Sequence, residues 1–366
     1  MWKIVIARAI KPQNFAGETR GLISKIVGIA VLLVGALLAA TLCFGAPADP
    51  GQIPSIFKPQ STPANSIFHL SLLVLAITGL IFAVVFTLLA YAVMKFRKRD
   101  DDDGREPPQV YGSNQVELAW TVIPTLIVLV LFLATARVIR SIQDAPKPPG
   151  AIEVIAIGHQ FWWEFRYPAL GVVTANELHV PVSNPANSTP TFLTLLSADT
   201  DHSFWVPRLA GKTDLIPNHP NHTWIDPQET GVYLGQCAQY CGVQHAKMLL
   251  RVYVDSPEEF SRWVQEQRKP AVNDDAVAEG RRIFETTSCV NCHAIAGTGA
   301  NGRFGPDLTH LMSRDTIASG AATNTPENLR AWIQNPDSIK PGSLMPAMQL
   351  NEKDMDALTA YLLTLR

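Results

Sequence analysis

Three apolar runs in the first 136 residues constrain the fold of this 366-residue chain more than any other sequence feature. The second and third runs, residues 67–94 and 118–136, can each cross a membrane, because about 20 apolar residues suffice. Five basic side chains lie between these two runs, so the positive-inside rule places that loop in the cytoplasm. We therefore expect a transmembrane helical hairpin within residues 47–144, and everything from about Arg140 onward on the outer side.

The first apolar run, residues 26–46, has no charged side chain and follows five basic residues. This order is typical of a secretory signal peptide or a signal anchor, which we expect over residues 1–46. Cys43 lies within this run. The bulky Leu42 before it argues against a lipoprotein attachment site, so we expect a packed or lipid-facing cysteine.

The rest of the sequence predicts two further domains. A net charge of −2 gives no signal for nucleic-acid binding. After a proline-rich linker, short β-branched or alternating segments separated by Gly, Pro and Asn predict a small sandwich or Greek-key barrel over residues 150–267. An all-α domain is expected over residues 276–366. The expected strands are 152–157, 177–182, 191–196, 231–234 and 249–254, and the expected helices are 257–267, one reaching Phe284, 326–334 and 352–365.

A cluster of metal-binding residue types lies between the last two predicted strands. Cys237, Cys241, His245 and Met248 fall within twelve residues, and soft sulfur ligands beside imidazole suit copper. The spacing allows each thiolate to bridge two copper ions, and His202 is the best candidate for a further ligand. The alternatives are a disulfide between the two cysteines, with His245 at the surface, and a zinc site, for which methionine is a poor ligand.

The all-α region contains Cys289-Val290-Asn291-Cys292-His293, the covalent attachment pattern of c-type haem. A thioredoxin-like dithiol is the alternative, but no βαβ pattern surrounds the motif. His293 would be the proximal iron ligand, and a distal methionine would raise the haem potential. Met345, in a Pro- and Gly-containing loop, is the best candidate, with Met348 as the second choice.

With these motifs, the chain resembles subunit II of haem-copper cytochrome c oxidases fused to a class I cytochrome c domain, as in the caa-type enzymes. The resemblance runs from about residue 67 to the end, and it rests on the hairpin, Gly158-His159-Gln160, His202-Ser203-Phe204-Trp205 and the cysteine loop. It implies a cupredoxin-like Greek-key domain that holds the binuclear copper centre CuA. The implied copper ligands are bridging Cys237 and Cys241, terminal His202 and His245, weakly bound Met248 and the backbone carbonyl of Gln239.

The chain departs from the family at two of these positions. Gln239 replaces a glutamate whose carboxylate also reaches a magnesium ion at the interface with subunit I, so we expect copper to be retained and magnesium binding to be weak or reorganised. Phe161 replaces a tryptophan at which electrons arrive from soluble cytochrome c. Trp162 could substitute for it, or the tethered haem could use another approach; the alternative is a packed strand with buried rings.

Glu117 lies at the start of the third apolar run. A carboxylate next to a membrane span is often functional, although a solvated glutamate at the membrane surface is common. The family has a matching glutamate near the mouth of a proton channel in subunit I, and the resemblance implies that role for Glu117.

The resemblance implies a subunit through which electrons enter a proton-translocating terminal oxidase of the bacterial inner membrane. Electrons would pass from a cytochrome c or an upstream respiratory complex to the c haem, then to CuA, then to subunit I, which holds the oxygen site; subunit III is a further expected partner. The alternatives are a subunit of a CuA-containing nitric oxide reductase and a stand-alone membrane-anchored carrier. The hairpin and Glu117 favour a large integral partner, and the copper ligands disfavour a quinol oxidase.

Overall fold

The computed structural model describes residues 54–97, 112–183, 188–272 and 274–366. The expected signal or anchor segment, Cys43 and most of the basic loop lie outside these residues. Residues 54–74 and 112–366 belong to one compact unit, which contains every strand and both candidate sites, and they are described together; residues 75–97 belong to another.

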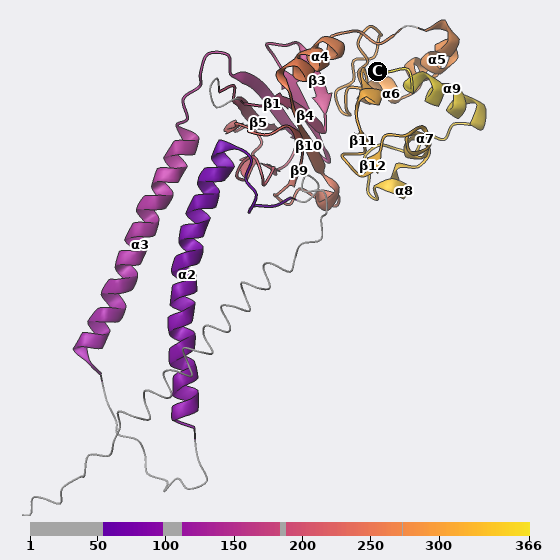
Figure 1. The fold of residues 1–366 in the computed structure, drawn as a ribbon. Helices are drawn as coiled ribbons and strands as arrows, with labels where there is room; N and C mark the ends of the chain where they lie inside the picture. Colours follow the sequence, from indigo (N-terminus) through magenta and orange to yellow (C-terminus); the bar gives the residue numbers. More distant parts are fainter. Residues whose placement is uncertain (1–53, 98–111, 184–187, 273) are drawn as a thin grey trace, which may run out of the picture. The chain divides into compact units, whose positions relative to one another are not determined.

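Two long helices contain the two predicted membrane spans. Helix α2 covers Thr62–Lys95 and helix α3 covers Asn114–Gln143, so each extends a few residues beyond the predicted run at both ends (Figure 1). Both are long and apolar enough to cross a membrane. Their leucine, valine and phenylalanine side chains are mostly exposed, as expected for helices whose solvent is lipid.

The region after α3 is a sandwich of two five-stranded sheets. Only two strand pairs are parallel, β1 with β5 and β4 with β10, and the other pairs are antiparallel. The first sheet has the order β3-β2-β1-β5-β8, with strands Val172–Ala175, Trp162–Tyr167, Ile152–His159, Thr191–Ser197 and Asn221–Ile225. The second has the order β4-β10-β9-β6-β7, with strands Glu177–Pro181, Leu249–Asp255, Gly231–Cys237, His202–Trp205 and Thr213–Leu215.

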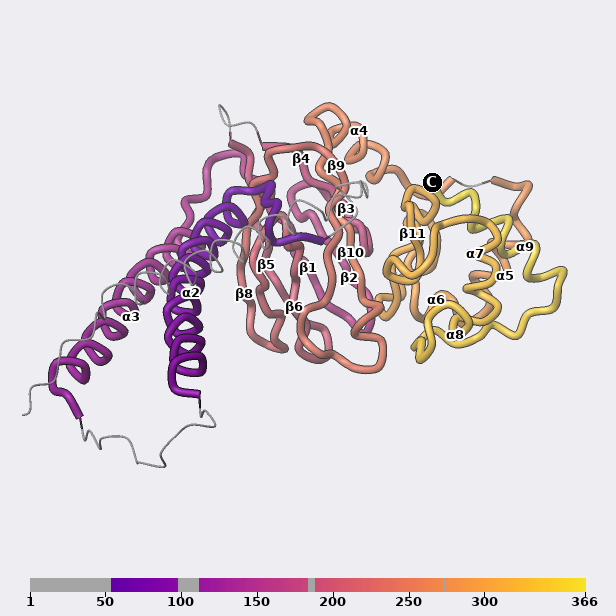
Figure 2. The backbone as a smooth tube through the Cα atoms, turned by 60° about the horizontal axis from the view of Figure 1, so that its bottom comes forward, coloured from indigo at the N-terminus to yellow at the C-terminus, as the bar shows by residue number. Residues whose placement is uncertain are grey.

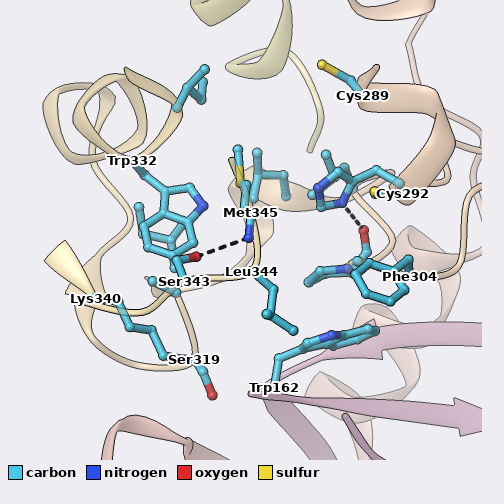
Figure 3. A pocket seen from close by; sticks show the side chains of 18 of the residues that line it. Trp162, Cys289, Cys292, Phe304, Ser319, Trp332, Lys340, Ser343, Leu344 and Met345 are labelled. Carbon is cyan, nitrogen blue, oxygen red and sulfur yellow. Dashed lines mark hydrogen bonds between the residues drawn. The ribbon is translucent and has the colours of Figure 1, made fainter. Parts of the chain in front are cut away.

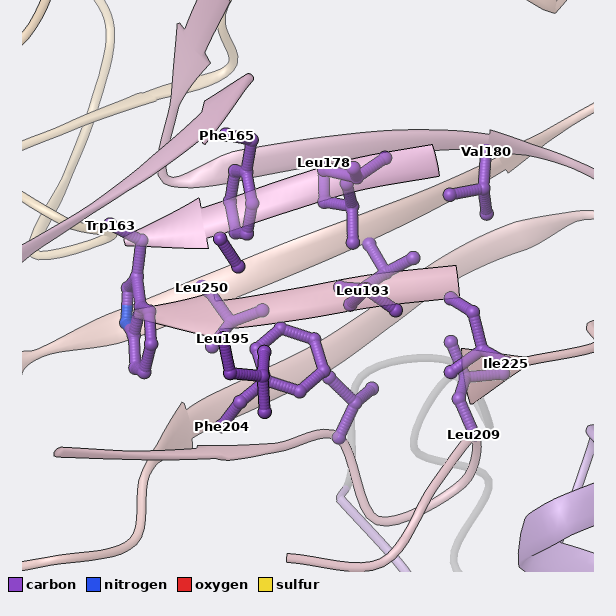
Figure 4. Close-up of a cluster of buried hydrophobic side chains, with 14 of the residues drawn as sticks. Trp163, Phe165, Leu178, Val180, Leu193, Leu195, Phe204, Leu209, Ile225 and Leu250 are labelled. Atoms are coloured by element: carbon purple, nitrogen blue, oxygen red, sulfur yellow. The ribbon is translucent and has the colours of Figure 1, made fainter. Parts of the chain in front are cut away.

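The core of the sandwich is built by alternation along the strands. Leu193 and Leu195 of β5 point inward and meet Leu178 of β4 and Leu250 of β10 (Figure 4). Successive side chains of a strand point to opposite faces, so every second residue enters this core. Helix α4 (Pro257–Gln267) covers part of the sandwich, and a capping box at Ser256 fixes its start.

The last ninety residues form a helical domain with its own core (Figure 2). Helix α5 packs against α9, with the rings of Phe284 and Tyr361 6.1 Å apart. A short two-stranded sheet lies between the helices in sequence. The helices are α5 (Ala278–Thr286), α6 (Cys289–Cys292), α7 (Pro326–Gln334), α8 (Pro336–Ile339) and α9 (Glu352–Leu362), and the strands are β11 (Thr316–Ile317) and β12 (Ala322–Thr323).

The five predicted strands correspond to β1, β4, β5, β9 and β10, and the predicted helices to α4, α5, α7 and α9. His202 begins β6, which is not one of the strands expected from the sequence. Strands β3, β6, β7 and β8 were not predicted, because each has at most five residues and too short a run to show a period of two.

We predict that Leu195→Ala will lower the free energy of unfolding of the sandwich by about 2–5 kcal/mol, because it leaves a cavity between the two sheets. The matched control is Val173→Ala on β3, where the side chain is 37 % exposed and the loss should stay within about 0.5 kcal/mol. Denaturant unfolding of the full chain in detergent, followed by tryptophan fluorescence, measures both. Equal losses in the two variants would contradict the core assignment.

Candidate functional site

The pairing of β6 with β9 brings the predicted copper ligands together. Phe204 of β6 lies opposite Cys237, the last residue of β9, so His202 at the start of β6 is near the thiol. The amide of Cys237 donates to the carbonyl of Met248, and the amide of Ala238 donates to the carbonyl of Ser203, each at 3.0 Å. These bonds close the loop that follows β9 into a compact turn.

All six predicted ligand groups lie within this turn and its neighbouring strand. Cys237 Sγ is 3.8 Å from Cys241 Sγ, 3.9 Å from His202 Nδ1 and 3.1 Å from the carbonyl oxygen of Gln239. Cys241 Sγ in turn is 3.7 Å from His245 Nδ1 and 3.9 Å from Met248 Sδ. The two thiols are thus at the centre of the cluster, and the remaining donors surround them.

The spacing of the two cysteines excludes a disulfide in this structure. A disulfide bond is about 2.05 Å long, and these sulfur atoms lie 3.8 Å apart. Both thiols and the Met248 thioether are buried. Hydrogen bonding between the thiols, opposed by burial, lowers the pKa of Cys237, so the cluster holds a thiolate readily.

His202 is oriented by a carboxylate that the sequence reading missed. Its Nε2 donates to Asp199 Oδ1 at 2.7 Å, which leaves Nδ1 facing the thiols. Burial opposes ionisation of Asp199, but hydrogen bonds from His202 and from the amides of Gln160 and Thr200 outweigh it and lower its pKa. The only available signal in the sequence was an aspartate three residues before a candidate ligand.

Gly158 explains part of the Gly158-His159-Gln160 motif. A side chain at this position would come within 2.8 Å of the His202 ring, so only glycine leaves room for the imidazole. Residues 238–248, between β9 and β10, are called the metal loop below. Gln160 contacts this loop directly, because its Nε2 donates to the carbonyl of Cys241 at 2.6 Å. The motif therefore holds the metal cluster from the neighbouring sheet.

The haem motif lines a cavity of about 290 Å³, mostly apolar. Cys289, Cys292 and Met345 surround it in the helical domain, and Trp162 of the sandwich lies along its edge (Figure 3). Both cysteines are half-buried and free. The cavity therefore places two thiols, a thioether and aromatic rings around one space, which fits a haem.

His293 is held in the state that an iron ligand requires. Its Nδ1 donates to the carbonyl of Pro306 at 2.7 Å, so Nε2 carries the lone pair. Burial lowers the pKa of this histidine and favours the neutral imidazole. A side chain at Gly305 would come within 2.5 Å of the His293 ring, which explains a glycine there.

The structure separates the two candidate methionines only partly. Met345 and Met348 both line the cavity. Met348 also packs against the core of the helical domain, and its amide donates to the carbonyl of Ile333 at 3.2 Å. Met345 follows the loop of residues 340–344 and lines the cavity without belonging to that core cluster of the described residues, so it stays our choice for the distal ligand.

The remaining predicted residues fall in different environments. Phe161 and Trp162 are both buried and both line the haem cavity, and the Trp162 ring stacks on His159 at 4.2 Å. Glu117 is exposed in the first turn of α3 and does not line the haem cavity. Sequence reasoning did not single out Gln244 and Lys340, which connect the two sites and gave no motif signal.

Comparison with known proteins covers all three regions of the chain. Family models match in order: the transmembrane domain of cytochrome c oxidase subunit II over residues 50–138, its periplasmic domain over 171–254, and cytochrome c over 277–366. The periplasmic domain of subunit II of the cytochrome oxidase of Bradyrhizobium japonicum is 28 % identical and covers 33 % of this chain and 96 % of its own, with a TM-score of 0.31.

Curated relatives align along most of the chain. "Cytochrome c oxidase subunit 2" of Alkalihalophilus pseudofirmus is 36 % identical over 319 residues, which are 84 % of this chain and 90 % of the relative. The protein of the same name from Bacillus sp. (strain PS3) is 34 % identical over 74 % of this chain and 80 % of its own. The chain therefore belongs to the cytochrome c oxidase subunit II family, in the form that carries a C-terminal cytochrome c domain.

Proposed function

We propose that this chain receives electrons on its own c haem and passes them through CuA to the haem-copper subunit I of a proton-translocating terminal oxidase. Membership of the subunit II family makes the chain a membrane-anchored subunit of an oxidoreductase, with an outer-side domain and subunit I as partner. The copper and haem of the pathway follow from the two domain types. The proposal adds the order of transfer, proton translocation, subunit III as a further partner and the bacterial inner membrane as location.

The observation that carries the proposal is the contact between the two sites. Phe161 lines the haem cavity, and its ring also packs on Gly242, where an added Cβ would lie 2.9 Å from the ring. Gly242 follows Cys241, so one aromatic residue spans from the cavity wall to the metal loop. A protein that stored metal would not need this proximity, whereas electron transfer does.

In this proposal, two copper ions would be held by the thiolates of Cys237 and Cys241 together with His202, His245, Met248 and the backbone carbonyl of Gln239. When bound, the copper pair supplies a centre that gains and loses one electron. Asp199 fixes the orientation of His202, and burial excludes water from the thiolates. The Gln239 carbonyl is a backbone group, so the change from glutamate leaves it intact while weakening any magnesium contact of the side chain.

Cys289 and Cys292 would attach the haem covalently, and His293 and Met345 would be the ligands of its iron. The carbonyl of Pro306 holds the His293 ring in place. Trp162 shields the cavity on the sandwich side and offers a ring for electron entry. Glu117 stands at the membrane surface, where it serves the mouth of a proton channel in subunit I.

Oxygen consumption by the purified complex tests the function as a whole. We expect reduced cytochrome c to support oxygen uptake and quinol to support none, because the copper and haem sites form a path for a one-electron donor. Uptake driven equally by quinol, or a preparation that lacks a multi-span haem subunit, would contradict the proposal.

Elemental analysis tests the copper ligands. We expect about two copper ions per chain in the native protein and less than one in Cys237→Ser, because the alcohol is a harder donor that bridges copper poorly. Val243→Ala, at a 79 % exposed position of the same loop, is the matched control and should keep its copper. Less than one copper ion per native chain would exclude the binuclear site.

Redox titration tests the distal haem ligand. Met345→Ala should lower the haem potential by roughly 0.1 V or more, within the ~0.8 V range that axial ligands control, and should change the visible spectrum. Met348→Ala should leave both nearly unchanged, since that side chain packs in the core. The opposite result would transfer the role to Met348.

A further inference from the structure

Two segments of the helical domain, which we also call the haem domain, contact the sandwich. Both segments contact residues in or next to the metal loop, which is the proposed copper loop. The first segment is residues 315–320 and the second is residues 339–342. Both sets of contacts lie within the compact unit to which residues 54–74 and 112–366 belong. Their chemistry shows how the domain is held.

The first contact is centred on a buried carboxylate. Glu177 of β4, 2 % exposed, accepts hydrogen bonds from the amide and hydroxyl of Thr316 at 2.9 and 2.8 Å, and from the amide of Asp315 at 3.1 Å. Next to it, the amide of Leu249 donates to the carbonyl of Ser319 at 3.3 Å, and the Ser319 hydroxyl donates to the carbonyl of Leu249 at 2.8 Å. Leu249 directly follows Met248.

The second contact joins the metal loop to the loop that carries Met345. Gln244, 4 % exposed, donates from Nε2 to the carbonyls of Lys340 and Pro341, each at 2.9 Å. Lys340, 3 % exposed, donates from Nζ to the carbonyl of Phe161 at 2.7 Å. Both donors are buried, and each finds an acceptor on the other domain.

The hydrogen bonds made by the side chains of Gln244 and Lys340 form a bridge between the two domains. This bridge lies close in sequence to proposed ligands of both centres. Gln244 directly precedes His245, and Lys340 and Pro341 lie five and four residues before Met345, respectively. The amide of Gln244 therefore links the backbone beside a proposed copper ligand to the backbone that leads to a proposed iron ligand. An alternative arrangement, in which a flexible linker lets the haem domain swing, would leave the amide and the ammonium without these partners.

We infer that Gln244 and Lys340 are positioning residues that hold the haem domain in one fixed pose on the copper loop, so that electrons cross without a docking step. This inference rests on the proposed function. The transfer oxidises the haem iron by one electron and reduces the copper pair by one. No covalent bond forms or breaks at the bridge. The two side chains therefore affect only the distance between the haem and copper sites and the fraction of time that the haem domain spends docked on the sandwich.

Hydrogen exchange provides a readout that does not depend on activity. The amides of Asp315, Thr316 and Leu249 are bonded across the domain boundary but lie in the other contact, away from Gln244. If the bridge fixes the whole domain, Gln244→Ala should speed exchange of these amides roughly tenfold, since it removes two hydrogen bonds. The matched control is Gln265→Ala, at an exposed position of α4.

Gln244→Glu and Lys340→Met separate the bridge from general damage to the loop. Gln244→Glu keeps the size of the side chain but places a carboxylate, which cannot donate, against two carbonyl oxygens. Lys340→Met keeps the aliphatic part of the side chain but removes the donor to the carbonyl of Phe161. Both should reproduce the faster exchange. Gln244 adjoins His245, so Gln244→Ala could also lose copper. In that case Lys340→Met, which lies outside the metal loop, tests whether the bridge fixes the haem domain.

Electron transfer in the purified complex completes the test. After rapid reduction of the haem, transfer to copper should be independent of solvent viscosity in the native protein and should become slower and viscosity-dependent in the bridge variants, with copper content and haem potential unchanged. Unchanged exchange, or a viscosity dependence already present in the native protein, would overturn the inference. Absence of any haem-to-copper transfer in the native protein would instead contradict the proposed function.

Discussion

The antiparallel pairing of β6 with β9 is the constraint on which the metal cluster depends. It places His202 beside Cys237, although the two residues are 35 positions apart in the chain. The sandwich core fixes this pairing, because a shift of one residue would turn the inward side chains of both strands to the opposite face. The cluster is therefore as rigid as the two packed sheets behind it.

Residues around this cluster come from β1 and from the loops that follow β1 and β5, and each has a separate role. Gly158 of β1 leaves room for the imidazole, Asp199 orients it, and Gln160 holds the loop carbonyl of Cys241. Such an arrangement holds the proposed ligand side chains in place through the protein's own contacts. A centre that exchanges electrons benefits from this, since little structure has to move when its charge changes.

The haem cavity is likewise built from residues of more than one element, and these belong to both the sandwich and the helical domain. Its wall includes Trp162, the first residue of β2, and Phe161, the residue before that strand. The sandwich already holds both side chains in place. The helical domain supplies Cys289, Cys292 and His293. Because Glu177 and Gln244 meet backbone groups of that domain, the two centres share one framework within the compact unit.

The sequence alone predicted the two apolar helices and the strongly alternating strands, and it named the residues that we propose as metal and haem ligands. These features are local: hydrophobic periodicity reveals β5 and β10, and ligand spacing reveals Cys237, Cys241 and the Cys289–His293 motif. Only the tertiary structure decided that His202 begins a strand next to Cys237, that Asp199 orients it, and that Gln244 and Lys340 join the two sites. Those relations depend on strand pairing and domain contact between residues far apart in the chain, and no local pattern encodes such a distance.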